Sequence, residues 1–184
     1  MGKLYYLENV FPESEGWHYY HRLKELVKWE QGKIKLFGKE LYEPRLSAFY
    51  GDGGKNYKYS NKVMVPRPWF VELEQIREVI GEVTGVKYNG VLLNFYRTGA
   101  DCMGMHSDDE KELVKEDGIA SVSFGAERII NFQHKKEKLA INVKLKNGSV
   151  LLMKGETQVN WKHGIAKSKN LNEGRINLTF RSVG

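Results

Sequence analysis

The chain has 184 residues, of which 41% are hydrophobic and 12% aromatic. This length and composition fit one domain with a sizeable core and exclude a disordered chain. A formal charge of +6 favours polyanionic partners such as nucleic acid, although a generally basic soluble protein has the same charge.

Two helices are predicted in the first half of the chain, separated at 33–65 by short strands and turns. Apolar residues recur at helical spacing from Pro12 to Gln31. The residues expected to face the core are Trp17, Tyr20, Leu23, Leu26 and Val27. Pro68 opens the second helix and Gly85 follows its end. Its apolar stripe contains Trp69, Leu73, Ile76, Ile80 and Val83.

From Tyr88 onward the pattern predicts mostly strands. The predicted strands are Val91–Tyr96, Ile119–Phe124, Arg128–His134, Leu139–Leu145, Ser149–Met153 and Arg175–Phe180. Asn147-Gly148, between two of them, is a dipeptide typical of hairpin turns. Two helices followed by many short strands predict an α+β fold, in which a two-sheet jelly roll has helices packed outside it.

His106, Asp108 and His163 offer two imidazoles and one carboxylate. This ligand set holds non-haem Fe(II) in oxygenases and leaves positions of the metal open, although other divalent metals could also fit. His106 and Asp108 are two residues apart, so on a strand both would point to one face. Because Asp109 and Glu110 follow directly, a surface loop with several solvated acids is the alternative.

The last predicted strand carries two arginines on one face. Polar residues alternate there with apolar ones, and the polar set is Arg175, Asn177, Thr179 and Arg181. Two guanidinium groups on one face repel each other unless an anion lies between them, and arginine binds carboxylates bidentately. The spacing suits a small dicarboxylic acid beside the metal. An ordinary half-exposed strand is the alternative.

These features resemble the AlkB family of Fe(II)- and 2-oxoglutarate-dependent dioxygenases over about residues 33–181. The matching segments are Asn94-Phe-Tyr96, His106-Ser-Asp108-Asp-Glu110, Ser121-Val-Ser-Phe-Gly125, Trp161-Lys-His163 and Arg175-Ile-Asn-Leu-Thr-Phe-Arg181. The resemblance implies a single domain over 1–184. About 1–87 would hold N-terminal helices and a nucleotide-recognition hairpin lid. About 88–184 would form the catalytic core, a double-stranded β-helix or jelly roll.

The resemblance also implies the cofactors and the reaction. His106, Asp108 and His163 would bind iron and carry catalysis. 2-Oxoglutarate would lie with its keto-acid end near Asn94 and Arg181, and with its far carboxylate near Arg175, Tyr96 and Asn177. With O2 as co-substrate, the enzyme would demethylate 1-methyladenine and 3-methylcytosine in DNA. Formaldehyde, succinate and CO2 would be released.

The N-terminal half resembles the mammalian branch of the family that repairs alkylated double-stranded DNA. The matching segments are Phe37-Gly-Lys39, Tyr50-Gly-Asp52, Tyr57-Lys-Tyr59-Ser60 and Pro66-Arg-Pro-Trp69. A base inside a duplex must be flipped out to reach iron, and a wedge that fills the gap offsets part of the cost. The resemblance gives this role to Phe37, whose alternative role is core packing.

The resemblance implies further contacts with the nucleic acid. Tyr57 would stack on the flipped base opposite His106, and Glu110 would lie near its exocyclic amino group. Tyr59 and Ser60 would complete the base-binding set. A carboxylate favours 1-methyladenine and 3-methylcytosine because both carry positive charge. For Glu110, a solvated loop position is the alternative.

Two basic segments are shorter than in the duplex-specific relatives. Only Gln133–Ala140 stands where those relatives have a longer basic hairpin, and Lys167-Ser168-Lys169 replaces three consecutive basic residues. Single-stranded DNA and RNA therefore stay open as substrates. The lysines expected to contact phosphates are Lys135, Lys136, Lys138, Lys167 and Lys169.

Two other functions are compatible with the sequence. One is demethylation or hydroxylation of RNA or protein with the same cofactors, and the other is a catalytically silent nucleic-acid-binding module. We expect an intracellular monomer, cytoplasmic or nuclear, with no membrane partner. No signal-peptide pattern or long apolar stretch is present, and Cys102 is the only cysteine.

Overall fold

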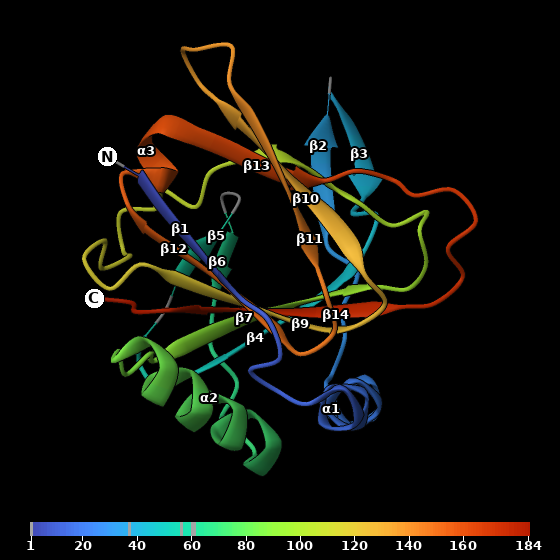
Figure 1. Cartoon of the computed structure of the whole chain (residues 1–184), viewed down its shortest axis with the longest axis vertical. Coiled ribbons are helices and arrows are strands. Elements are labelled where there is room, and N and C mark those ends of the chain that lie inside the picture. Colours follow the sequence, from blue (N-terminus) through green and yellow to red (C-terminus); the bar gives the residue numbers. More distant parts are fainter. Residues whose placement is uncertain (1, 37, 56, 60–61) are drawn as a thin grey trace.

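The computed structural model describes residues 2–36, 38–55, 57–59 and 62–184. In its two small hairpins, only the backbone is described at 34–36, 39, 57–59, 62 and 63. Most of the strands form two antiparallel sheets, and two long helices cover the outer face of the larger sheet (Figure 1). The predicted α+β class with a jelly-roll core is confirmed.

The larger sheet has six strands in the order β1-β12-β9-β14-β7-β4. These strands are β1 (Gly2–Leu7), β12 (Ser149–Gly155), β9 (Ile119–Gly125), β14 (Arg175–Arg181), β7 (Gly90–Tyr96) and β4 (Leu46–Gly51). β1 and β4 come from the first half of the chain and form the two edges. The central strands β9, β14 and β7 are buried along their whole length. The core sheet therefore uses strands from both halves.

The smaller sheet has four strands in the order β11-β10-β13-β8. These are β11 (Ala140–Leu145), β10 (Arg128–His134), β13 (Trp161–Ile165) and β8 (Met103–His106). Its inner face packs against the larger sheet through a second apolar cluster, which includes Ile130, Phe132, Leu151 and Met153. The two sheets thus enclose an interior that is separate from the helix-facing core.

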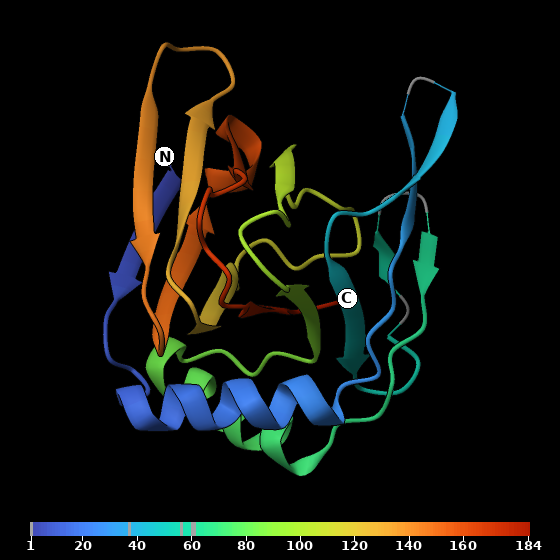
Figure 2. The ribbon, with the colours of Figure 1, turned by 90° about the vertical axis from the view of Figure 1, so that its right-hand side faces the viewer.

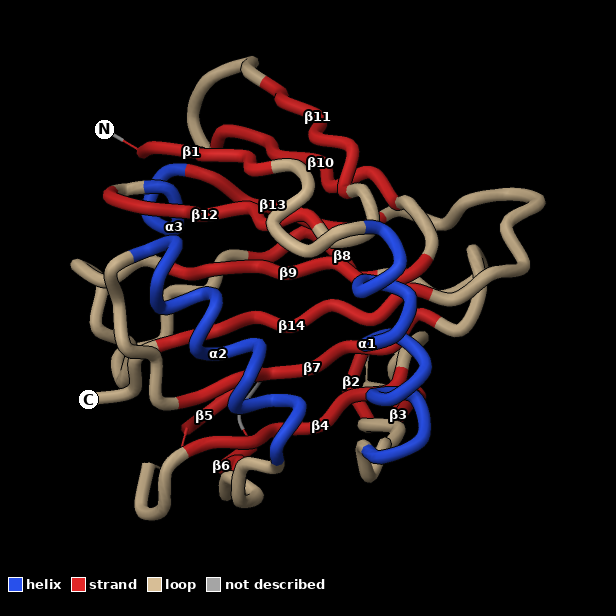
Figure 3. The backbone as a smooth tube through the Cα atoms, turned by 60° about the horizontal axis from the view of Figure 1, so that its bottom comes forward, coloured by secondary structure: helices blue, strands red, loops and turns tan. Residues whose placement is uncertain are grey.

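Two helices bury the other face of the larger sheet (Figure 3). They are α1 (Glu13–Leu26) and α2 (Val71–Thr84), and a short helix α3 (Thr157–Asn160) precedes β13. Leu23 and Ile76 pack with Phe124 and Leu178 in this main core. Because the helices cover the apolar side chains of β9 and β14, the opposite faces of those strands can carry polar residues. No described helix is long and apolar enough to cross a membrane.

Two small hairpins stand apart from the sheets. The first joins β2 (Lys33–Leu36) to β3 (Lys39–Tyr42), and the second joins β5 (Tyr57–Tyr59) to β6 (Lys62–Met64). Figure 2 shows the β2–β3 and β10–β11 hairpins extending in the same direction, with β8 between them. They flank the end of β8, where His106 lies.

The first helix ends earlier than predicted. Val27 is extended, with φ −73° and ψ 130°, so α1 stops at Leu26 and not at Gln31. The turn leaves Leu26 41% exposed, while Tyr19, an earlier residue of the same helix, is buried. Val83, at the end of α2, is also 40% exposed. The predictions that Leu26 and Val83 face the core are therefore wrong. Gly85 ends α2 in the left-handed conformation, as predicted.

All six predicted strands form, with ends that differ by at most two residues from those predicted. The hairpin prediction at Asn147-Gly148 is wrong, since β11 and β12 belong to different sheets. The Asn147 side chain accepts a hydrogen bond from the Gly125 N–H and donates to the Glu13 carbonyl. Gly148 has φ +73°, and a Cβ there would lie 2.1 Å from the Phe11 carbonyl oxygen. The turn therefore connects a strand of the smaller sheet to a strand of the larger sheet and packs closely against Phe11.

We expect Phe124→Ala to lower the free energy of unfolding by about 3–5 kcal/mol, because it leaves a large cavity in the main core. Phe124 is fully buried and its ring lies 5.2 Å from that of Phe11. Urea denaturation measures the change. Ile129→Ala, at a position 51% exposed, serves as the control and should cost less than about 1 kcal/mol. Equal losses in both variants would contradict this description of the core.

Candidate active site

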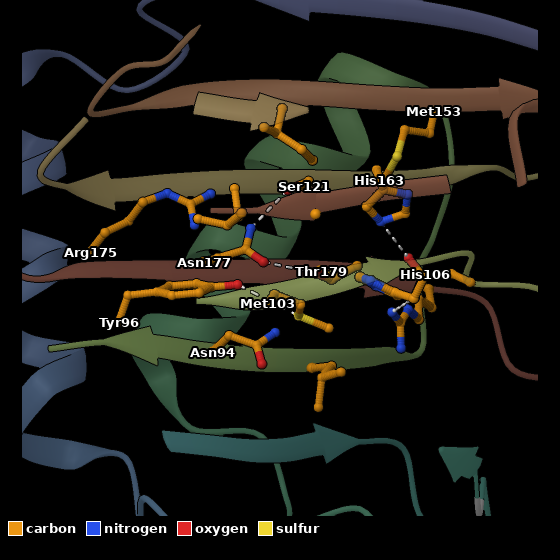
Figure 4. A pocket seen from close by; sticks show the side chains of 16 residues that line it. Asn94, Tyr96, Met103, His106, Ser121, Met153, His163, Arg175, Asn177 and Thr179 are labelled. Atoms are coloured by element: carbon orange, nitrogen blue, oxygen red, sulfur yellow. Dashed lines mark hydrogen bonds and ion pairs between the residues drawn. The ribbon is translucent and has the colours of Figure 1, made fainter. Parts of the chain in front are cut away.

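A polar pocket lies between the two sheets, on the side of the larger sheet away from the helices (Figure 4). It contains about 450 Å³ of space not filled by protein atoms. Its walls include the inward side chains of β7, β14, β8 and β13. The polar face of β14 lies here, and every residue of β14 is buried, which excludes the alternative of an ordinary half-exposed strand.

His106, Asp108 and His163 meet at one end of this pocket. His106 and His163 are cross-strand partners on β8 and β13. The Nε2 atoms of His106 and His163 lie 3.7 and 3.5 Å from the Asp108 carboxylate oxygens. One ligand atom from each residue lies within 4.8 Å of the others. Because β8 ends at His106, the same-face argument from strand geometry was wrong for Asp108, although the two side chains do converge.

The loop after β8 is held in place by contacts with α3 and β13. The Asp108 N–H donates to Gln158 Oε1 over 2.9 Å, and the Ser107 hydroxyl donates to the Trp161 carbonyl over 2.7 Å. The Gln158 amide nitrogen also lies 3.3 Å from the Met153 sulfur. These contacts fix the backbone that carries Asp108, so its carboxylate faces the two histidines.

The protonation of His106 and Asp108 suits a divalent metal. His106 Nδ1 lies 2.9 Å from the Gly104 carbonyl, and an N–H at Nδ1 leaves the Nε2 lone pair free for a metal. Burial lowers the pKa of His106. Burial alone would raise the pKa of Asp108, but Arg181 and the two histidines outweigh it and lower that pKa. A neutral imidazole at His106 and an ionised carboxylate at Asp108 fit Fe(II).

The two arginines of β14 have different surroundings. Arg181 Nη2 donates to Asp108 Oδ1 over 2.6 Å, so this guanidinium supports the metal-ligand carboxylate. Arg175 is only 2% exposed. Its Nη2 donates to the Ser123 hydroxyl, while Nε and Nη1 have no hydrogen-bond partner among the described residues. Burial lowers the pKa of Arg175 to about 10, which leaves it charged at neutral pH.

A buried cation with two open donors is costly unless an anion pairs with it. Arg175 lines the same pocket as the metal-binding triad, and its guanidinium lies 5.4 Å from the centre of the Tyr96 ring. The pocket therefore has a cationic end at Arg175 and a metal-binding end at Asp108. This arrangement fits an acid that binds the metal at one end and a guanidinium at the other.

Asn94 and Asn177 line the same pocket but make different contacts. Asn94 Oδ1 accepts a hydrogen bond from Arg45 Nε over 2.8 Å. The Asn177 amide donates to the Ser121 hydroxyl and the Val122 carbonyl and accepts from the Thr179 hydroxyl. Since these neighbours occupy the Asn177 amide, this side chain is part of the fixed pocket wall, and the Asn94 nitrogen is the freer donor.

The comparisons with known proteins agree with this geometry. Residues 3–181 match the family described as the 2OG-Fe(II) oxygenase superfamily. The DNA oxidative demethylase ALKBH2 of Mus musculus is 37% identical over 185 residues, which are 95% of this chain and 77% of that protein. The Homo sapiens protein of that name is also 37% identical, over 95% of this chain and 71% of that protein. This chain belongs to the AlkB family of 2OG-Fe(II) oxygenases.

Other relatives support the same family. The alpha-ketoglutarate-dependent dioxygenase alkB homolog 3 of Rattus norvegicus is 38% identical over 173 residues, 88% of this chain and 58% of that protein. The solved structure of OsALKBH1 has the same fold, with a TM-score of 0.67 and 18% identity over 97% of both chains. The protein is therefore an Fe(II)- and 2-oxoglutarate-dependent dioxygenase, and its His106-Asp108-His163 triad could bind the iron.

The predicted base-binding residues of this AlkB-family enzyme are only partly described. Phe37 and Ser60 lie outside the described residues, and Tyr57 and Tyr59 belong to β5 without described side chains. Glu110 lies two residues after Asp108 and lines a second cavity that shares Asp108 with the main pocket. The roles predicted for these residues stay predictions.

The five predicted phosphate-binding lysines lie in two separate loops. Lys135, Lys136 and Lys138 lie in the β10–β11 turn, and Lys167 and Lys169 lie in the loop after β13 (Figure 1). All five are exposed. Lys135 also reaches inward, since its Nζ donates to the Gln158 carbonyl over 2.9 Å. Lys135 therefore contacts the same residue, Gln158, that holds the backbone of Asp108.

Several residues of the site were not predicted. Gln158 and Arg45 contact Asp108 and Asn94, but they lie 50 and 49 residues away along the chain. No periodicity connects such positions. Ser121 and Ser123 were noticed only as part of a matching segment, and their contacts with Asn177 and Arg175 give them a physical role.

We expect Gln158→Leu to weaken metal binding by about tenfold or more, because it removes the acceptor that fixes the Asp108 backbone. Titration with Mn(II) alone measures this affinity. Gln158→Glu keeps an acceptor oxygen and should retain more of the affinity, while Val159→Ala, at an exposed neighbouring position, should leave it unchanged. Wild-type affinity in Gln158→Leu would show that the Asp108 loop does not need this contact.

Proposed function

We propose that this AlkB-family dioxygenase repairs DNA by oxidative demethylation of 1-methyladenine and 3-methylcytosine. The observation that carries the proposal is that one buried pocket holds the His106-Asp108-His163 triad at one end and the open Arg175 guanidinium at the other. The DNA oxidative demethylases named above, 37% identical over 95% of this chain, support DNA as the substrate.

2-Oxoglutarate would bind along the pocket from Asp108 to Arg175. Its far carboxylate would accept hydrogen bonds from the guanidinium of Arg175, which has open donors, beside Tyr96. Its keto-acid end would lie near Asn94 and Arg181. The pairing of Arg181 with Asp108 supports this orientation, because Arg181 is already engaged at the metal-binding end. Bidentate binding of a carboxylate by Arg175 would then satisfy its buried charge.

Bound Fe(II) would supply the oxidation of the N-methyl carbon, which neither side chains nor 2-oxoglutarate alone can perform. One O2 and one 2-oxoglutarate would be consumed for each methyl group, which would leave as formaldehyde while succinate and CO2 form. The chain's own share is positional. Arg175 and Asn94 would orient the acid, and the triad would fix the distance between the metal and the base.

The DNA base would approach from the side where the two hairpins project. Tyr57 and His106 would stack on either side of it, with Tyr59 and Ser60 at its edge. The carboxylate of Glu110 would favour a cationic methylated base over an uncharged normal base. Phe37 would fill the gap that the flipped base leaves in a duplex. Lys135, Lys136, Lys138, Lys167 and Lys169 would contact phosphates.

His106→Ala is expected to abolish demethylation, because it removes one of three metal ligands. The assay incubates the protein with Fe(II), 2-oxoglutarate and DNA containing 1-methyladenine and follows loss of the methyl group by mass spectrometry. Lys111→Ala, in the exposed loop beyond the site, is the matched control and should keep wild-type activity. If His106→Ala demethylates DNA at the wild-type rate, the triad is not the catalytic centre.

Phe37→Ala is expected to slow repair of duplex DNA by about tenfold and to leave single-stranded DNA within about twofold, because only a duplex has a gap to fill. Matched single- and double-stranded substrates give the two rates. Leu41→Ala, at an exposed position on β3, controls for general damage to the β2–β3 hairpin. An equal loss of repair rate on single- and double-stranded DNA would show that Phe37 is not a wedge.

Methylated RNA of the same sequence tests the second candidate substrate. The scattered, exposed lysines and the short β10–β11 turn favour a protein that contacts phosphates without a long clamp on the second strand. RNA demethylated faster than DNA would assign this enzyme to RNA and would leave the cofactor chemistry unchanged.

A further inference from the structure

A buried ion pair lies behind Asn94 and has no part in the proposed reaction. Arg45 and Glu43 are 6% and 8% exposed. Arg45 Nη2 lies 3.3 Å from Glu43 Oε1, and Arg45 Nε donates to Asn94 Oδ1 over 2.8 Å. Both residues belong to the segment that connects β3 to β4. A buried arginine that contacts a pocket-lining amide can control how that amide is turned.

The chemistry of the contact determines which end of the Asn94 amide faces the pocket. A guanidinium has only donors, so the atom that faces Arg45 must be the amide oxygen. The amide nitrogen then points the other way, and Figure 4 shows it directed into the pocket with the oxygen directed away. Without Arg45 the amide could turn over at little cost, because its nitrogen and oxygen ends have nearly the same shape.

Glu43 holds Arg45 and ties it to the β2–β3 hairpin. A Cβ at Gly32 would lie 2.5 Å from Glu43 Oε2, so the glycine leaves room for this carboxylate. The Glu43 N–H donates to the Gly32 carbonyl over 2.8 Å, and the Gln31 amide donates to the Glu43 carbonyl over 2.9 Å. These contacts lie at the base of the β2–β3 hairpin. The hairpin and the cofactor pocket are therefore joined through Glu43, Arg45 and Asn94.

We propose that Arg45, held by Glu43, is a positioning residue that keeps the N–H donors of Asn94 directed at the keto-acid end of 2-oxoglutarate. The inference rests on the proposed function, because it needs 2-oxoglutarate in this pocket. Arg45 itself touches neither the acid nor the metal-binding triad. Among the residues that line the pocket it hydrogen-bonds to Asn94, and it acts on Tyr96 only through its charge.

A double-mutant cycle between Arg45→Met and Asn94→Ala tests the proposal. Each variant is loaded with Mn(II), so that no turnover occurs, and the Kd of 2-oxoglutarate is measured by calorimetry. Each single change is expected to weaken 2-oxoglutarate by roughly tenfold, the size of one hydrogen bond to a charged group. The double variant should bind nearly as Asn94→Ala does, because the hydrogen bond of Arg45 to the pocket lining is made to Asn94.

A truncated acid shows which end of 2-oxoglutarate is affected. 2-Oxobutyrate keeps the keto-acid end and lacks the far carboxylate. Arg45→Met should weaken 2-oxobutyrate by the same factor as 2-oxoglutarate. Arg175→Met should weaken only 2-oxoglutarate. If Arg45→Met affects 2-oxoglutarate but not 2-oxobutyrate, the keto-acid role is wrong.

Further variants separate positioning from general stability. Glu43→Gln keeps an acceptor for Arg45 and should leave the Kd within about threefold of the wild type. Asn94→Asp keeps the acceptor for Arg45 but turns a carboxylate toward the acid, so it should bind 2-oxoglutarate more weakly than Asn94→Ala. This comparison decides the question even if Arg45→Met does not fold.

The outcomes separate the two proposals. A wild-type protein that binds no 2-oxoglutarate would overturn the proposed function and the role of Arg45 with it. A second outcome is that the wild type binds 2-oxoglutarate but the double variant binds it about a hundredfold more weakly, the product of the two single effects. This outcome would overturn only the role of Arg45. If Asn94→Asp bound 2-oxoglutarate as tightly as Asn94→Ala does, the role of Arg45 would also be overturned.

Discussion

The burial of charged side chains between two sheets is the constraint on which this site depends. Asp108, Arg175 and Arg181 are all nearly inaccessible to solvent. Such groups are stable only when opposite charges or hydrogen bonds compensate for lost hydration. Asp108 and Arg181 compensate each other within the protein. Arg175 donates to Ser123 and lies against the Tyr96 ring, and its Nε and Nη1 have no hydrogen-bond partner among the described residues, so these donors favour an anion from outside.

The helix layer makes this interior possible. α1 and α2 cover the apolar face of the larger sheet, where Phe124, Leu178 and Phe180 are fully buried. Burial of that face supplies the hydrophobic stabilisation of the sheet. The opposite face can then hold Asn177, Arg175 and their partners without loss of the fold. Stability and chemistry are thus divided between the two faces of the same strands.

Contacts that support the site come from segments far apart in the sequence. Gln158 on α3 fixes the backbone of Asp108, and Arg45 before β4 contacts the amide of Asn94. Each support reaches a different residue of the pocket. A change in the β2–β3 hairpin or in α3 can therefore alter the site without altering any residue that lines it.

The sequence by itself determined the residue types and much of the secondary structure. The alternation of polar and apolar residues from Arg175 to Arg181 predicted both the strand and the face with two guanidiniums, because side chains alternate along any strand. The His106-x-Asp108 pair and His163 indicated the metal. Their convergence could not be derived from strand geometry, since Asp108 lies beyond the end of β8.

Only the tertiary structure decided which of these groups have partners. Arg175 and Arg181 have the same residue type and lie on the same strand face, yet one pairs with Asp108 and the other has open donors. The Asn147-Gly148 turn likewise links two sheets, although its sequence is typical of a hairpin. Local pattern specifies which way a side chain points along its own element. What it meets there depends on contacts between distant segments, and these form only when the sheets pack together.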